Sequence, residues 1–161
     1  MKKMIVSVFI ALMLLIIVAS VAFASAGQKQ LPFKGSMHAV ENNEVDWPTI
    51  YVHGSGSGNA TTVGKFTVTY EGIVQNDENG VGTGTLTAHF VAANGDSLYA
   101  EASGLGQPTE TPGVNRIVEN YTITGGTGRF DGATGSFTVA RLISLATGVT
   151  DGTIEGQIVL P

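Results

Sequence analysis

Two charged residues interrupt rows of alternating apolar residues, and they are the best candidates for chemistry in this sequence. The rows are Ile117, Tyr121 and Ile123 around Glu119, and Phe137, Val139 and Ile143 around Arg141. If these rows face an interior, an isolated charge there is costly, so we expect Glu119 and Arg141 to pair. Beside Tyr121, such a pair could bind or polarise a ligand. The alternative is that both charges lie near strand ends and reach solvent.

The other polar residues form no catalytic or metal-binding pattern. His38, His53 and His89 share no ligand-like spacing, and the chain has no cysteine to supplement them. The sequence also lacks the G-x-S-x-G motif of a nucleophilic serine. We therefore expect no metal and no cofactor, and we assign no catalytic residue.

The elements that position these residues are predicted to be β-strands. Apolar residues recur at every second position, as in KFTVTYEG and GTLTAHFVA, which is typical of half-buried strands. Glycine-, proline- and asparagine-rich segments separate the runs, and the longest, 104–114, could cover one end of the fold. The strands are expected at 34–41, 49–54, 65–74, 82–92, 96–103, 115–124, 135–143 and 151–160.

Eight antiparallel strands with short connections favour an all-β, calycin-like eight-stranded barrel, with a two-sheet sandwich as the alternative. A barrel of this size is filled by side chains or holds one small ligand. The large apolar residues of each strand share one face, which must be the interior if the sheet closes. We predict an apolar pocket whose polar exceptions are Glu119 and Arg141, lined by Phe66, Tyr70, Leu86, Phe90 and Tyr121.

The segment TGGTGRFDGATGSF, residues 124–137, is the most distinctive in the chain. A phosphate loop needs the pattern G-x-x-x-x-G-K-[ST], which this segment lacks. A dinucleotide fingerprint needs a following helix, and none is predicted here. A calcium-binding repeat places its aspartate one position earlier than Asp131 and recurs along the chain, which this segment does not. We therefore interpret it as a structural turn whose glycines permit positive φ or close backbone approach.

Within this segment the pattern G-G-T-G-x-F-x-x-A-x-G resembles the signature of dirigent proteins and the wider allene-oxide-cyclase-like family. The residues that carry it are Gly125, Gly126, Gly128, Phe130, Ala133 and Gly135. The resemblance implies an eight-stranded antiparallel barrel. It also implies functions that range from cyclisation of reactive fatty-acid epoxides to orientation of phenoxy radicals, and includes exported bacterial proteins without an assigned role. The motif contains none of the family's pocket acids or arginines, so no role is carried over.

The N-terminus is predicted to be a signal peptide, residues 1–26. Lys2 and Lys3 precede an apolar run that ends in small-x-small sites at residues 22–26, and an uncleaved membrane anchor is the alternative. Cleavage leaves a single β-barrel domain, residues 27–161, with six basic and thirteen acidic residues and a net charge of −7. The domain is therefore expected to be secreted or periplasmic.

Charge and surface pattern limit the expected partners. The mature chain lacks a basic cluster, so nucleic acid is a poor partner. The threonine-rich outer rows do not suit an outer-membrane barrel, and we expect no stable membrane insertion after cleavage. We predict a domain that binds or guides a small apolar molecule without covalent catalysis. A cofactor-free cyclase or isomerase, and a structural or interaction protein with a filled barrel, are the alternatives.

Overall fold

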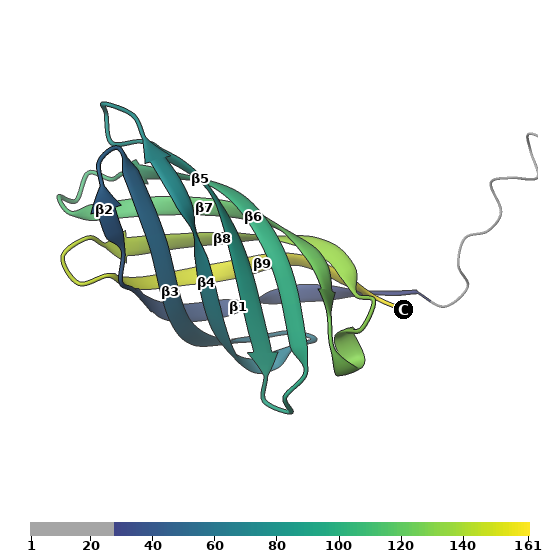
Figure 1. Ribbon diagram of the computed structural model, residues 1–161. Coiled ribbons are helices and arrows are strands. Elements are labelled where there is room, and N and C mark those ends of the chain that lie inside the picture. The colour runs from purple at the N-terminus through teal and green to yellow at the C-terminus, as the bar shows by residue number, and fades with distance from the viewer. Residues whose placement is uncertain (1–27) are drawn as a thin grey trace, which may run out of the picture.

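The computed structural model describes residues 28–161, so the predicted signal peptide, 1–26, lies outside the described residues. The described chain is all-β (Figure 1). Its elements are β1 Lys29–Glu41, β2 Glu44–Asp46, β3 Thr49–Ala60, β4 Gly64–Asn76, β5 Gly82–Ala92, β6 Ser97–Pro108, β7 Val114–Gly126, the short 3₁₀ turn η1 Gly128–Phe130, β8 Thr134–Ser144 and β9 Val149–Leu160. In residues 28–161, no helix is long and apolar enough to span a bilayer.

The long strands close into an eight-stranded antiparallel barrel. Each strand from β3 to β8 pairs with the next, β9 pairs with β1, and β1 pairs with β3 through Gly35–Glu41 against Ala60–Gly54. The three-residue β2 adds to the outside edge of β3. Each long strand thus has a neighbour on both sides, although residues 29–34 of β1 pair only with β9. The predicted barrel is confirmed, and the two-sheet alternative is wrong.

The third strand continues through a segment that its composition predicts to be a turn. Instead of ending at residue 54, β3 runs on through SGSGN to Ala60. A Cβ at Gly54 would overlap the ring of Tyr70, and one at Gly58 would overlap the ring of Phe66. Glycine is needed at Gly54 and Gly58 because aromatic rings from β4 occupy the space where a side chain would lie, and the backbone there continues as a regular strand.

The connection between β6 and β7 is shorter than predicted. Residues up to Pro108 belong to β6, and β7 begins at Val114, so only residues 109–113 connect the two strands. The predicted connection at 104–114 is therefore wrong in its bounds, because residues 104–108 belong to β6. Gly104 and Gly106 instead occupy inward positions of the strand, where both border an interior cavity.

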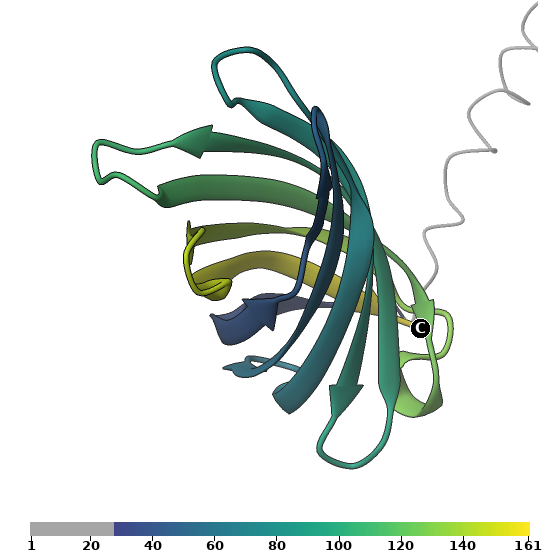
Figure 2. The ribbon, with the colours of Figure 1, turned by 60° about the vertical axis from the view of Figure 1, so that its left-hand side comes forward.

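The two ends of the barrel differ (Figures 1 and 2). We call the end that carries residues 61–63, 93–96 and 127–133 the closed end, because aromatic rings fill the half of the interior beside it. Phe33 and Phe137 meet edge to face with centroids 4.7 Å apart, and Phe66 and Phe90 do so at 5.3 Å. The opposite end, which carries residues 42–48, 77–81, 109–113 and 145–148, is called the mouth.

Candidate functional site

A buried ion network lies in the half of the barrel nearest the mouth. Arg141 of β8 donates from Nη2 to Oε1 of Glu119 at 2.7 Å and from Nε to Oε2 of Glu119 at 3.1 Å. Its Nη1 donates to Oε1 of Glu41 at 2.5 Å and to the hydroxyl of Thr150 at 3.3 Å. The side chains of Glu41, Glu119 and Arg141 are only 2%, 3% and 3% exposed. One guanidinium thus bridges carboxylates from β1 and β7.

Further hydrogen bonds fix both carboxylates. The Tyr70 hydroxyl donates to Oε1 of Glu41 at 3.1 Å, and the Tyr121 hydroxyl donates to Oε2 of Glu119 at 3.4 Å. Nδ2 of Asn43 donates to Oε2 of Glu41 at 2.7 Å. Across residues 28–161, every buried side-chain nitrogen and oxygen has a hydrogen-bond partner. A fully satisfied polar network of this kind is rigid, so it presents its groups in a fixed geometry.

The protonation states follow from burial and from the neighbouring charges. Burial opposes the charge of Arg141, but the charge and hydrogen bonds of Glu119, and then the charge of Glu41, raise the guanidinium pKa above its ordinary value. Burial raises the pKa of the Tyr70 and Tyr121 phenols. The neighbouring carboxylates add to this rise, and the positive charge of Arg141 opposes it. At neutral pH the network therefore contains a guanidinium cation and two neutral phenol donors.

The network forms the floor of a cavity of about 80 Å³ that faces the mouth. The walls are apolar side chains from several strands, namely Ile50, Val52, Val74, Leu86, Ile117 and Ile143. The inward glycines of β5 and β6 border the cavity, at Gly82, Gly84, Gly104 and Gly106. Space remains beside Gly106, where an added Cβ would meet no atom closer than 3.6 Å, whereas side chains of Val74 or Glu119 pack over the other three. The cavity thus combines apolar walls with charged groups held at its base.

The residues predicted to line a pocket divide into three groups. Leu86, Glu119 and Arg141 line the cavity. Tyr70 and Tyr121 are buried behind it, where their hydroxyls hold the carboxylates. The remaining two, Phe66 and Phe90, belong to the aromatic packing of the closed half.

Sequence reasoning missed Glu41, which completes the ion network. Glu41 is the last residue of β1, and it occupies the same inward row as Met37 and Ala39. The signal was the one that identified Glu119, a charge in phase with apolar residues. It was weaker here because a strand-end position ordinarily reaches solvent.

The glycine-rich motif lies at the closed end, away from the cavity. Gly128 has φ of +58°, and a Cβ there would overlap the Asp96 carboxylate. Gly126 lacks a positive φ, but a Cβ there would lie 2.6 Å from Cβ of Phe130. These glycines allow η1 to place Phe130, which is fully buried, against the core. This segment therefore covers the closed end of the barrel.

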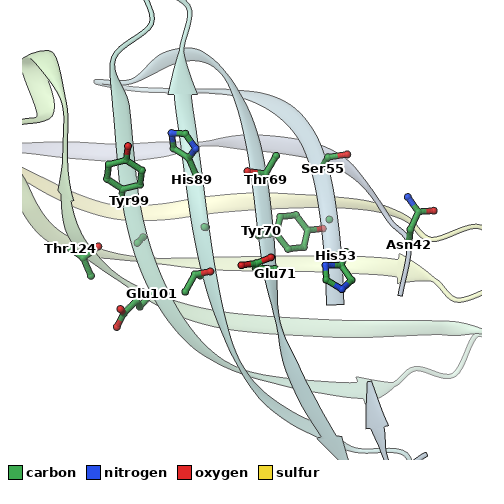
Figure 3. A pocket seen from close by; sticks show the side chains of 14 residues that line it. Asn42, His53, Ser55, Thr69, Tyr70, Glu71, His89, Tyr99, Glu101 and Thr124 are labelled. Atoms are coloured by element: carbon green, nitrogen blue, oxygen red, sulfur yellow. The ribbon is translucent and has the colours of Figure 1, made fainter. Parts of the chain in front are cut away.

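A second concavity, of about 590 Å³, lies on the outer face of β3 to β7. Figure 3 shows its side chains spread over neighbouring strands. The His89 ring stacks on the Tyr99 ring, with centroids 4.8 Å apart. Its two carboxylates, Glu71 and Glu101, are exposed to solvent. Within residues 28–161, no cluster of three or more potential metal ligands occurs. The interior cavity is the better candidate site because its charged groups are buried and fixed.

Comparison with known proteins supports the fold. No family model matches the sequence, and no curated protein matches it. The structure is similar to that of the pterocarpan synthase dirigent protein GePTS1, with a TM-score of 0.54 and 16% identity over 88% of this chain and 94% of that chain. The pterocarpan synthase dirigent protein PsPTS1 aligns with a TM-score of 0.41 and 14% identity over 86% of this chain and 97% of that chain. The likeness to GePTS1 shows that this chain has a dirigent-like β-barrel fold, and the resemblance predicted from the glycine motif is confirmed at the level of the fold.

Proposed function

We propose that the domain binds or guides a small molecule with an apolar body in the mouth cavity, without bonding to it covalently. The observation that carries the proposal is the cavity itself, with apolar walls above the buried Glu41–Arg141–Glu119 network. Small-molecule sites combine apolar walls with a few fixed polar groups in this way. The cavity measures about 80 Å³. Since pockets for drug-sized ligands begin at roughly 300 Å³, the ligand is small or only partly enclosed.

Preorganisation supports the same proposal. Arg141, Glu41 and Glu119 are already held by mutual hydrogen bonds, so binding a ligand does not require ordering them. The similar barrel GePTS1 is named a pterocarpan synthase dirigent protein, and a role toward a small organic molecule is in keeping with that likeness. We further propose that this domain acts outside the cytoplasm, after removal of residues 1–26.

The proposal is tested by filling the cavity without disturbing the barrel. Gly106 lines the cavity, and a Cβ added there would lie 3.6 Å from Cγ1 of Ile117, an ordinary contact distance. Gly106→Leu should therefore fold and occupy the ligand space. Gln107→Leu is the matched control, because it adds the same side chain at the next, outward-facing position of β6.

Native mass spectrometry of the purified mature protein should detect a bound small molecule in wild type and in Gln107→Leu, and none in Gly106→Leu. Titration with benzyl alcohol provides a second readout. It should shift the methyl NMR signals of Leu86 and Ile117 in the first two proteins only. Equal binding by Gly106→Leu and wild type would place the site elsewhere and contradict the proposal.

A further inference from the structure

The distribution of charge specifies the ligand more closely. We infer that the mouth cavity takes an organic cation, a small primary ammonium group carried on an apolar body. This inference rests on the proposed function of the cavity and adds the charge of the ligand to it.

The cavity floor has one more carboxylate than it has cations. Glu41 and Glu119 face the single guanidinium of Arg141, and all three side chains line the cavity. The other polar side chains that line it, Asn43, Asn76 and Asn115, are neutral. A buried carboxylate without a full counter-charge is costly, so a cation that enters the cavity is favoured.

The carboxylates also retain capacity to accept hydrogen bonds. A carboxylate offers about four acceptor sites. Glu41 accepts from Arg141, Tyr70 and Asn43, which leaves room for about one further donor. Glu119 accepts two bonds from Arg141 and one from Tyr121, which leaves similar room. An ammonium group carries three donors and matches two carboxylates near one another.

An anion finds less to bind. Arg141 makes four hydrogen bonds within the network, to Glu41, Glu119 and Thr150. Since a guanidinium has five N–H donors, about one remains for a ligand. An anionic ligand would also lie against the same two carboxylates that a cation would neutralise.

The connections at the mouth carry charge of the same sign. Residues 42–48, 77–81, 109–113 and 145–148 contain five carboxylates and no lysine or arginine, the acids being Glu44, Asp46, Asp77, Glu78 and Glu110. Four of the six basic residues in 28–161 lie toward the closed end instead, namely Lys29, Lys34, Lys65 and Arg129, and outside the network only Arg116, near the start of β7, lies on the mouth side. A cleft surrounded by one sign of charge concentrates ions of the opposite sign. The mouth therefore attracts cations and repels anions.

Three probes that share one ring separate charge from apolar burial. Benzylammonium, benzyl alcohol and benzoate are titrated into the mature protein at neutral pH, and the methyl NMR signals of Leu86 and Ile117 are followed. We expect benzylammonium to bind about tenfold more tightly than benzyl alcohol, the size of one charge-assisted hydrogen bond, and benzoate to bind most weakly. Raising the salt from about 20 mM to about 500 mM should reduce this preference, because salt screens the field of the mouth.

The residue that carries the excess charge is tested by Glu41→Gln. Glutamine can still accept from Tyr70 and Arg141, and the remaining pair of Arg141 with Glu119 is balanced in charge, so the barrel should fold. The ratio of benzylammonium to benzyl alcohol affinity should fall toward one. Glu101→Gln removes the same charge from the exposed outer face of β6, and it should leave the ratio unchanged.

The outcomes distinguish the charge of the ligand from the function of the cavity. Equal affinities for benzylammonium and benzyl alcohol, or an unchanged ratio in Glu41→Gln, would overturn the inference. The cavity would then bind its ligand without a preference for charge, and the proposed binding function would stand. If none of the three probes shifts the cavity signals, the proposed function and the inference are both overturned.

Discussion

Replacement of Arg141 by methionine should be among the most destabilising single changes in this barrel. The change removes four hydrogen bonds and leaves Glu41 and Glu119, with side chains 2% and 3% exposed, without a cation. Breaking a buried ion pair by removing one partner costs about 3 to 5 kcal/mol. For a domain of this length that loss lowers the melting temperature by about 10 to 20 °C.

The other members of the network should respond unequally. Glu119→Gln should cost less than Arg141→Met, because Arg141 keeps its bond to Glu41. The double variant should cost less than the two single losses summed, since the residues share one network. Adding Glu41→Gln removes the last buried charge, and this triple variant should recover much of the stability lost in Arg141→Met.

Urea unfolding at neutral pH, followed by circular dichroism, measures the free energies of unfolding for the four variants and wild type. Small, additive losses of less than about 1 kcal/mol each would place these charges in solvent and refute the reasoning. Non-additive losses with unchanged binding of benzyl alcohol would keep the network but make it a feature of the core. Non-additive losses together with loss of benzyl alcohol binding would support the proposed site.

Three further predictions concern the closed end, alkaline pH and the N-terminus. Gly128→Val should prevent folding, because its Cβ would overlap the Asp96 carboxylate and the backbone there has φ of +58°. Gly64→Val is the control and should still fold, because φ is +78° but the Cβ would point into open space. The solubility and the urea unfolding of the two variants are compared. The free energy of unfolding should fall as pH rises above about 10. The raised pKa values of Tyr70 and Tyr121 keep these phenols protonated in the folded protein at a pH at which the unfolded chain releases the protons. Replacement of both residues by phenylalanine should make the free energy of unfolding depend less on pH in this range. N-terminal sequencing of exported protein should find cleavage near residues 24–26, and intact chain in membrane pellets would contradict it.

The strands were predictable because their period of two follows from a sheet with one apolar face. The errors fall where glycines occur within strands. Residues 55–59 and 104–108 have the composition of turns, yet both continue regular strands, β3 and β6. Local preference favours a turn there, but tertiary packing decides otherwise, because β3 must admit the rings of Tyr70 and Phe66.

The candidate site was predictable only in part, for a related reason. The phase of Glu119 and Arg141 indicated two inward charges, and the structure pairs them. The position of the cavity depended on which residues face one another across strands, and a sequence does not contain that register. The glycines of β3 lie opposite aromatic residues of β4, with Gly54 paired to Tyr70, so the space is filled.

Between β5 and β6 the register places glycines opposite one another. Gly82 pairs with Gly106 and Gly84 pairs with Gly104, so neither strand supplies an inward side chain there. Side chains of the flanking strands, Val74 of β4 and Glu119 of β7, pack over three of these glycines, and an added Cβ meets only an ordinary contact at Gly106. These pairings join segments that are distant in the sequence, and they allow Glu119 to reach inward over a glycine and border the cavity.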